Sequence, residues 1–219
     1  MADDLPIHVD DVLWHPSNGE AHTLIAGEDG LTVLVVAEGS RTNITWLPRT
    51  GQFWLGPRWS PGDTDNPFAA DAALGPLDVP APTAERPPTI RNLADLELTE
   101  GRSGRLAYAT RQMRSDDLVL AQDEMPPDTH NTDLHFHSAR EEAWFVRAGS
   151  GIARLGEDGH PLRAGSFWLR RENTGVGHRI EVGPEGMRLV TMGDLIPGDV
   201  CVYPEKRTFK PARGLELPY

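Results

Sequence analysis

Short apolar stretches, separated by turn-forming residues, recur along most of the chain. Stretches of roughly four to eight residues rich in branched and aromatic side chains and bounded by Gly, Pro, Asn or Asp are typical of β-strands. The chain has 22 glycines and 19 prolines, which interrupt any longer helical pattern. The pattern therefore predicts a mainly β protein, with strands at 31–36, 106–110, 118–120, 134–137, 143–146, 151–155, 166–169 and 187–192.

A proline-rich stretch at 78–88 divides the chain. Proline cannot donate a hydrogen bond to a strand ladder and favours an extended connector. We therefore expect a boundary near residue 85, with one segment at 1–85 and a second at 86–219. Within the first segment, residues 53–77 show no regular period, and short helical turns are predicted around 68–71. The evenly spaced strands of the second segment are typical of a sandwich or barrel.

The two segments share a sequence pattern. Sliding the chain by 156 positions aligns His22 with His178 and Gly30 with Gly186, and the flanking apolar positions match without a gap. This favours a β-rich partial copy of the second segment in the first, although two unrelated hairpins could share such glycines. The first copy has no neighbouring histidine pair and no following glutamate, so we expect it to bind no metal.

Composition narrows the possible partners and locations. The chain has 21 basic and 33 acidic residues, a net charge of −12, which repels nucleic acid. No apolar run approaches the roughly 20 residues that cross a bilayer. The acidic start differs from a secretory signal. We therefore expect a cytoplasmic protein that binds neither nucleic acid nor membrane. Cys201 is the single cysteine, expected to serve as buried packing, so histidine and carboxylate would have to hold any metal.

The clearest candidate chemistry lies in one predicted hairpin. His135 and His137 occupy alternate positions of a strand, so both side chains can point to the same face. A tight turn at 138–140 would place Glu142 at the start of the next strand, where its carboxylate can approach the same point. One hairpin thus offers three metal ligands. His178 is a candidate fourth, but its spacing alone does not place it beside the others.

These residues carry a family resemblance. The pattern H-x-H-x(4)-E-x(6)-G at 135–149, followed by Pro161, Gly165 and His178, resembles the two signature motifs of the cupin superfamily, although the proline common before the last histidine is missing. Residues 86–208 are similar to a bacterial branch of mostly uncharacterised metal-binding cupins. The resemblance implies an all-β fold, a double-stranded β-helix (jelly-roll) barrel with an N-terminal partial repeat. It also implies a divalent metal ion held by His135, His137, Glu142 and His178.

The donor set suits several metals. Imidazole and carboxylate ligands suit Fe(II), which we favour, and also Zn, Mn, Ni or Cu. The alternatives are a barrel that has these residues but binds no metal, a polar hairpin with surface histidines, or ligation by Glu141 in place of Glu142.

Other residues are candidates for a substrate pocket, with packing or solvent exposure as the alternative for each. They are His130, Trp144, Val146, Phe167 and Trp168. Three arginines, Arg154, Arg163 and Arg170, could anchor an anionic substrate, or could simply be solvated.

Three functions are compatible with such a centre. The first is a dioxygenase that acts on a small organic substrate. The second is a non-redox isomerase or lyase in which the ion acts as a Lewis acid. The third is a module that binds a small molecule without turnover. Exposed strand edges and the resemblance to cupins also suggest a homodimer.

Overall fold

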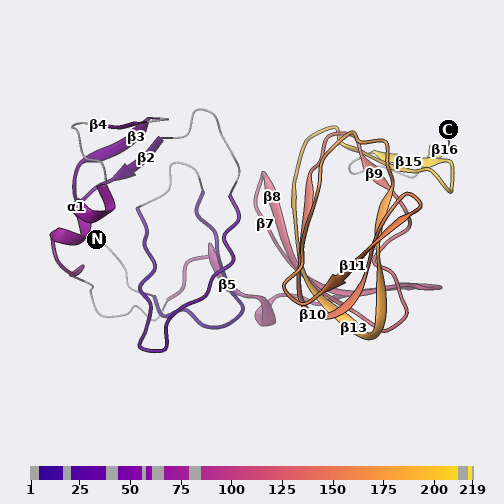
Figure 1. Ribbon diagram of the computed structural model, residues 1–219, viewed down its shortest axis with the longest axis horizontal. Helices are drawn as coiled ribbons and strands as arrows, with labels where there is room; N and C mark the ends of the chain where they lie inside the picture. Colours follow the sequence, from indigo (N-terminus) through magenta and orange to yellow (C-terminus); the bar gives the residue numbers. More distant parts are fainter. Residues whose placement is uncertain are drawn as a thin grey trace. The chain divides into compact units, whose positions relative to one another are not determined.

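The computed structural model describes residues 5–16, 21–37, 44–55, 58–60, 67–78, 85–211 and 217–218. The chain divides into two compact units, one formed by Met1–Ile7 with Leu13–Ile90 and the other by His8–Val12 with Arg91–Tyr219 (Figure 1). We call them the N-terminal and C-terminal units. Strands β1 (Asp11–Leu13) and β5 (Ile90–Asn92) lie where the chain changes from one unit to the other.

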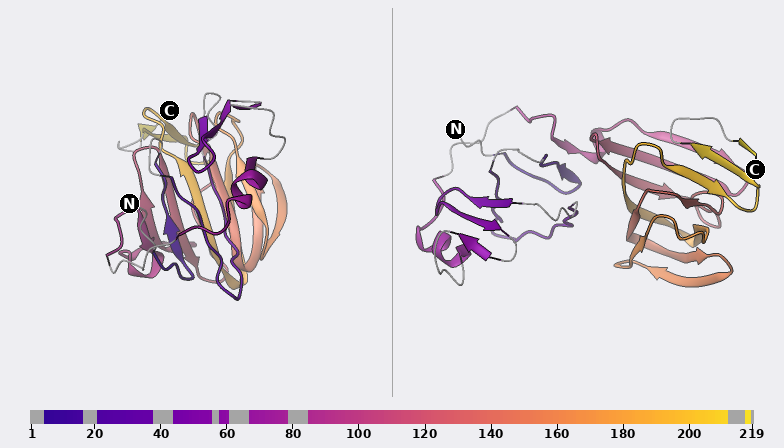
Figure 2. Two further views of the ribbon diagram at one scale, coloured as in Figure 1. Left: turned by 90° about the vertical axis from the view of Figure 1, so that its left-hand side faces the viewer. Right: turned by 90° about the horizontal axis from the view of Figure 1, so that it is seen from above.

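The C-terminal unit is built from antiparallel strands in two sheets (Figure 2). The larger sheet has, in order, β11 (Asp158–Arg163), β10 (Glu142–Leu155), β13 (His178–Asp194), β8 (Leu118–Met125), β7 (Leu106–Arg114) and β6 (Thr99–Ser103), and β12 (Phe167–Arg170) also pairs with β10. The smaller sheet has β16 (Leu217–Pro218), β15 (Thr208–Pro211), β14 (Val200–Tyr203) and β9 (Phe136–His137). A short 3-10 helix, η1 (Leu93–Asp95), precedes them.

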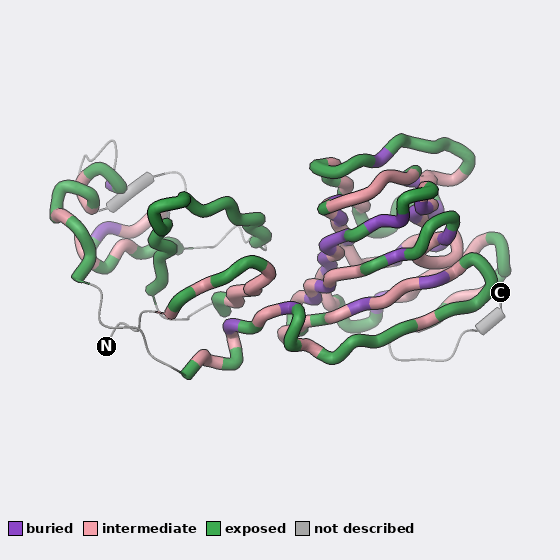
Figure 3. The backbone as a smooth tube through the Cα atoms, turned by 90° about the horizontal axis from the view of Figure 1, so that it is seen from below, coloured by how far each residue is buried: buried purple, intermediate pink, exposed green. Residues whose placement is uncertain are grey.

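The strands predicted at 106–110, 118–120, 166–169 and 187–192 are present, and most are longer than expected. The two predicted strands at 143–146 and 151–155 are one continuous strand, β10. Alternation explains the core: every second residue of β10 from Glu142 to Val146 is buried. The main apolar cluster consists of Met125, Trp144, Val146, Ala153, Leu162, Ile180, Val182, Met187 and Leu189. Figure 3 shows these buried stretches following the strands of this unit.

The N-terminal unit contains a small antiparallel sheet of β2 (Ile44–Leu47), β3 (Gln52–Leu55) and β4 (Arg58–Ser60), and one helix, α1 (Pro67–Ala73). The helix confirms the turns predicted around 68–71. In the described part of the chain, no helix is long and apolar enough to span a membrane. Most of the predicted linker, residues 79–84, lies outside the described residues.

The strand predicted at 31–36 is wrong. Residues 31–37 form no strand, and the apolar side chains between Leu31 and Val36 are exposed. A strand needs a hydrogen-bonded neighbour, and none pairs with this stretch among the described residues. Its counterpart in the repeat alignment lies in β13, which pairs with β10 and β8. One feature is shared: Gly30 and Gly186 both have positive φ, 78° and 75°.

Strands β10 and β13 pair with each other, antiparallel, along almost their whole length. Glu142 at the start of β10 pairs with Gly193 near the end of β13, and Leu155 at the end of β10 pairs with His178. The register shifts on both sides of Gly149, which has a φ of 82°. Here the two backbones approach so closely that a Cβ on Gly149 would lie 2.0 Å from the carbonyl oxygen of Gly186. Only glycine fits this bulge.

We expect Gly149→Ala to lower the free energy of unfolding by more than about 3 kcal/mol, because the backbone must move to admit the methyl group. Gly165→Ala is the matched control. Gly165 also has positive φ, 85°, but the space around its Cβ position is open. The Gly165→Ala variant should therefore lower the free energy of unfolding by only about 1–2 kcal/mol, the cost of the left-handed backbone. Urea unfolding measures both variants, and equal losses would contradict the role given to the close approach.

Candidate metal centre

The predicted hairpin is wrong, because β9 pairs with β14 and β10 pairs with β11, β12 and β13 in the other sheet, but the turn between β9 and β10 still brings the three candidate ligands together. His137 is the last residue of β9, and Glu142 is the first residue of β10. The imidazole rings of His135 and His137 are 5.1 Å apart and nearly perpendicular. Nε2 of His137 lies 3.4 Å from Oε2 of Glu142, so this contact links the small sheet to the large one. All three side chains are buried.

His178 joins them through the backbone. His135 and His178 form an antiparallel bridge in which each N–H donates to the other's carbonyl, at 3.2 and 2.7 Å. Residues paired in this way carry their side chains on the same face. The two rings are accordingly 4.5 Å apart, and Nε2 of His178 lies 3.1 Å from Oε2 of Glu142. The structure therefore brings together all four residues singled out in the sequence.

The distances from the Glu142 carboxylate to the three imidazoles are close to those between ligands of one divalent ion. Oε2 of Glu142 is 3.1, 3.4 and 3.7 Å from Nε2 of His178, His137 and His135. Ligand atoms at about 2.1 Å from an ion and at right angles to each other are about 3.0 Å apart. The three Glu142 contacts are near this value. The ligand atoms of His135, Glu142 and His178 all lie within 4.8 Å of one another. The cluster thus forms a candidate site for a divalent metal.

The buried carboxylate shapes the electrostatics of the centre. Burial alone would raise the pKa of Glu142, but the imidazoles of His135 and His178 hold it well below its usual range. Burial lowers the pKa of His178 to about 4, against the opposing attraction of Glu142. The centre therefore combines an ionised carboxylate with neutral imidazole, the protonation states that metal ligands require.

Hydrogen bonds behind the ligands orient two of the imidazoles. Nδ1 of His137 lies 2.6 Å from Oδ2 of Asp199, and Nδ1 of His135 lies 3.0 Å from the backbone carbonyl oxygen of Asp133. With a proton on each Nδ1, both rings present the Nε2 lone pair to the centre. The buried Nδ1 of His178 has no hydrogen-bond partner among the described residues.

Asp199 was missed by the sequence interpretation. Its Oδ1 accepts hydrogen bonds from the backbone N–H groups of Ala139 and Arg140, at 2.9 and 3.2 Å. Asp199 thereby holds both the turn between β9 and β10 and the ring of His137. Burial opposes ionisation of Asp199, but these N–H groups and His137 lower its pKa. The sequence offers one signal, a lone acid in an otherwise apolar stretch at 199–203.

Arg140 supplies positive charge beside the ligands. Its Nη2 lies 3.4 Å from Oε1 of Glu142. The guanidinium packs against the backbone of Gly193, where a Cβ would come within 2.4 Å of Nη2. The buried Nε has no hydrogen-bond partner among the described residues. Arg140 was not among the arginines considered from the sequence.

The residues proposed for a substrate pocket differ in their exposure to solvent. Trp144 is 3% exposed, stacks on Trp168 at 4.6 Å and packs edge-on against His178 at 5.4 Å. Val146 is buried in the core. Phe167 differs from the expectation: 57% of it is exposed, because alternation along β12 turns it away from the face of Trp168.

His130 lies in the loop ahead of the ligands, and its Nδ1 is 3.0 Å from the carbonyl oxygen of Thr132. The arginines also differ in position. Arg154 forms an ion pair with Glu181, and Arg163 is exposed. Arg170 is half-buried and contacts the hydroxyl of Thr174. Burial lowers the pKa of Arg170, and its charge is one of the influences that lower the pKa of His178.

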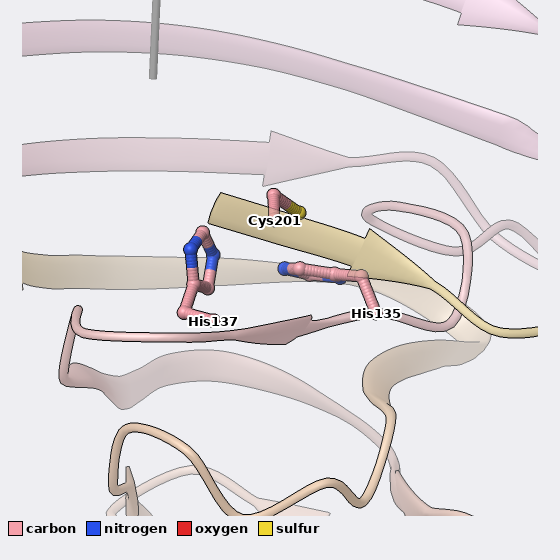
Figure 4. Close-up of side chains that lie close together, drawn as sticks. All are labelled: His135, His137 and Cys201. Carbon is pink, nitrogen blue, oxygen red and sulfur yellow. The ribbon is translucent and has the colours of Figure 1, made fainter. Parts of the chain in front are cut away.

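Cys201 lies beside the candidate metal ligands, so the expected role as buried packing does not describe it completely. Its sulfur and the ligand atoms of His135 and His137 lie within 4.8 Å of one another. Figure 4 shows the imidazoles of His137 on β9 and of His135 just before it, with Cys201 on the neighbouring strand beside them. Burial raises the pKa of the Cys201 thiol to about 11.

Comparisons with known proteins identify the fold. No protein-family model matches the sequence, and no curated protein resembles it significantly. Among solved structures, a candidate sugar phosphate isomerase from Acidithiobacillus ferrooxidans is 18% identical, with a TM-score of 0.51 over 57% of this chain and 85% of that one. A sugar phosphate isomerase of the cupin superfamily from Silicibacter pomeroyi is 15% identical, with a TM-score of 0.51 over 57% of this chain and 90% of that one. At such identities the likeness shows the fold alone.

We expect Asp199→Asn to weaken binding of a divalent metal about 10- to 100-fold, because the amide cannot replace both the charge and the acceptor behind His137. Asp158→Asn makes the same charge change at an exposed position of β11 and should leave the affinity unchanged. Competition with a chromophoric chelator measures both dissociation constants. Equal affinities in the two variants would show that the Asp199 carboxylate does not orient a ligand.

Proposed function

We propose that this chain, which has the cupin double-stranded β-helix fold, is an enzyme that uses one divalent transition metal ion on a small organic substrate. The ligands are His135, His137, Glu142 and His178. The observation that carries the proposal is the position of the Glu142 carboxylate, whose Oε2 lies within 3.7 Å of three imidazole nitrogens in a buried site. Burying these polar groups without an ion or a function would only cost stability.

The residues around the ligands have separate tasks. When bound, the ion supplies redox or Lewis-acid chemistry at the coordination positions that the protein leaves to substrate. Trp144 and Trp168 form an apolar wall against His178 and exclude water. The Arg140 guanidinium, 3.4 Å from Glu142, adds positive charge that favours an anionic or oxygen-rich substrate.

The reaction we propose first is dioxygenation, with Fe(II) as the metal. Three imidazoles and one carboxylate are a donor set that suits Fe(II), which would supply redox chemistry with dioxygen when bound. The aromatic wall provides the dry environment that oxidative chemistry requires.

Isomerisation of a sugar phosphate or similar hydroxy-carbonyl compound is the second candidate. Two observations favour it: the two solved structures reported above are described as sugar phosphate isomerases, one of them as a candidate, and Arg140 and Arg170 bring positive charge close to the ligands. In such a reaction the ion acts as a Lewis acid and dioxygen is not consumed.

Metal content tests the metal site, on which both candidate reactions depend. Protein purified without an affinity column should carry close to one equivalent of metal, measured by elemental analysis. His135→Ala should lose most of it, because one of four donors is removed. His160→Ala, at an exposed position of β11, is the control and should retain it. Retention of metal by His135→Ala would contradict the proposed site.

The two reactions differ in their use of dioxygen. With Fe(II) and an aromatic or enolic substrate, a dioxygenase shows oxygen uptake that His135→Ala abolishes. An isomerase incorporates solvent deuterium into a sugar phosphate under anaerobic conditions. Oxygen electrode and NMR measurements on the same metal-loaded protein distinguish them. Ligand-induced thermal stabilisation without either turnover would favour a binding module instead.

A further inference from the structure

Strand β14 turns one face toward the histidines. Cys201 pairs directly with His137 across the antiparallel ladder of β14 and β9, and Val202 pairs with Phe136. Directly paired residues place their side chains on the same face of a sheet. The thiol therefore points to the side where the imidazole of His137 points, and this direction is set by the register of the two strands.

The residues two positions before and two positions after Cys201 support this placement. Side chains two residues apart on a strand share a face. Oδ2 of Asp199, two residues before Cys201, is hydrogen-bonded to Nδ1 of His137. The ring of Tyr203, two residues after it, lies 5.8 Å from the ring of His135. Both flanking residues thus contact the ligand histidines from the same side as the thiol.

The distances suit metal binding. The sulfur of Cys201 and one nitrogen each of His135 and His137 lie within 4.8 Å of one another. Two ligand atoms on opposite sides of an ion, at about 2.1 Å for nitrogen and 2.3 Å for sulfur, are about 4.4 Å apart. The three atoms can therefore reach one ion after shifts of a few tenths of an ångström.

Two donor groups consequently share His135. One contains His135, Glu142 and His178, and the other contains His135, His137 and Cys201. We propose that Cys201 is a metal ligand of this centre, so that the centre offers a thiolate for ions with affinity for sulfur, such as Co(II), Zn(II) and Cd(II). Binding replaces the thiol proton by the ion and releases that proton to solvent. The inference depends on the proposed metal site and adds a donor to it.

Thiolate ligation has a direct spectroscopic signature. The metal-free full-length protein, prepared by chelator dialysis, is titrated with Co(II). We expect the visible bands of bound Co(II) together with an intense near-ultraviolet band from thiolate-to-cobalt charge transfer. Cys201 is the only cysteine of the chain, so no other residue can produce that band.

Variants complete the experiment. Cys201→Ser should lose the charge-transfer band, keep visible Co(II) bands from the remaining ligands and bind Cd(II) at least about tenfold more weakly, with little change for Mn(II), which prefers oxygen. Val202→Ala, which alters the next position of β14, controls for damage to the strand and should behave as the wild type.

A second measurement does not depend on cobalt. Saturating Zn(II) should slow alkylation of Cys201 by iodoacetamide at least about tenfold in the wild type, because a ligated sulfur is a poor nucleophile. His135→Ala should abolish this protection. Protection that persists in this variant would overturn the inference.

The outcomes separate this inference from the proposed function. Visible Co(II) bands without a charge-transfer band in the wild type would leave the metal site in place and overturn ligation by Cys201. Absence of any Co(II) binding would overturn both.

Discussion

A buried carboxylate surrounded by imidazoles is the interaction on which this structure depends. Glu142 begins β10 in the large sheet, and its Oε2 reaches Nε2 of His137 in the small sheet at 3.4 Å. A charge removed from water needs close partners of opposite sign or strong hydrogen-bond donors. The imidazoles and Arg140 supply them, and an ion would supply more. The fold therefore holds together a set of polar groups that an apolar core would not need.

Support for the ligands comes mainly from the segment around β14. Asp199 fixes the ring of His137 and also accepts hydrogen bonds from the backbone of the turn after it. The same residue thus sets a ligand's orientation and the return of the chain toward Glu142. Cys201 and Tyr203 continue this face along the strand. A short inner strand of the smaller sheet, paired with β9 and β15, accordingly contributes as much to the centre as the long strands do.

Local rules recovered the part of the site that lies within residues 135–142, although the two strands there belong to different sheets and do not form the predicted hairpin. Alternation placed His135 and His137 together, and a tight turn placed Glu142 at the head of the next strand, as the structure shows. His178, Asp199 and Cys201 depend on pairing between strands 40 or more residues apart, which spacing does not reveal. The cupin resemblance supplied His178 but not the other two. The strand at 31–36 failed for a related reason, because apolar alternation indicates strand propensity and does not provide a partner.

The bulge at Gly149 links metal binding to the stability of the fold. His178 pairs with Leu155, thirteen residues along β10 from Glu142, a separation of about 43 Å in a straight strand. Yet Nε2 of His178 lies 3.1 Å from the Glu142 carboxylate. The paired strands must therefore curl back on themselves, and the irregular register around Gly149 is where they bend. An ion held by both residues can bind only when the strands are bent in this way. Its binding free energy therefore adds directly to the stability of the fold.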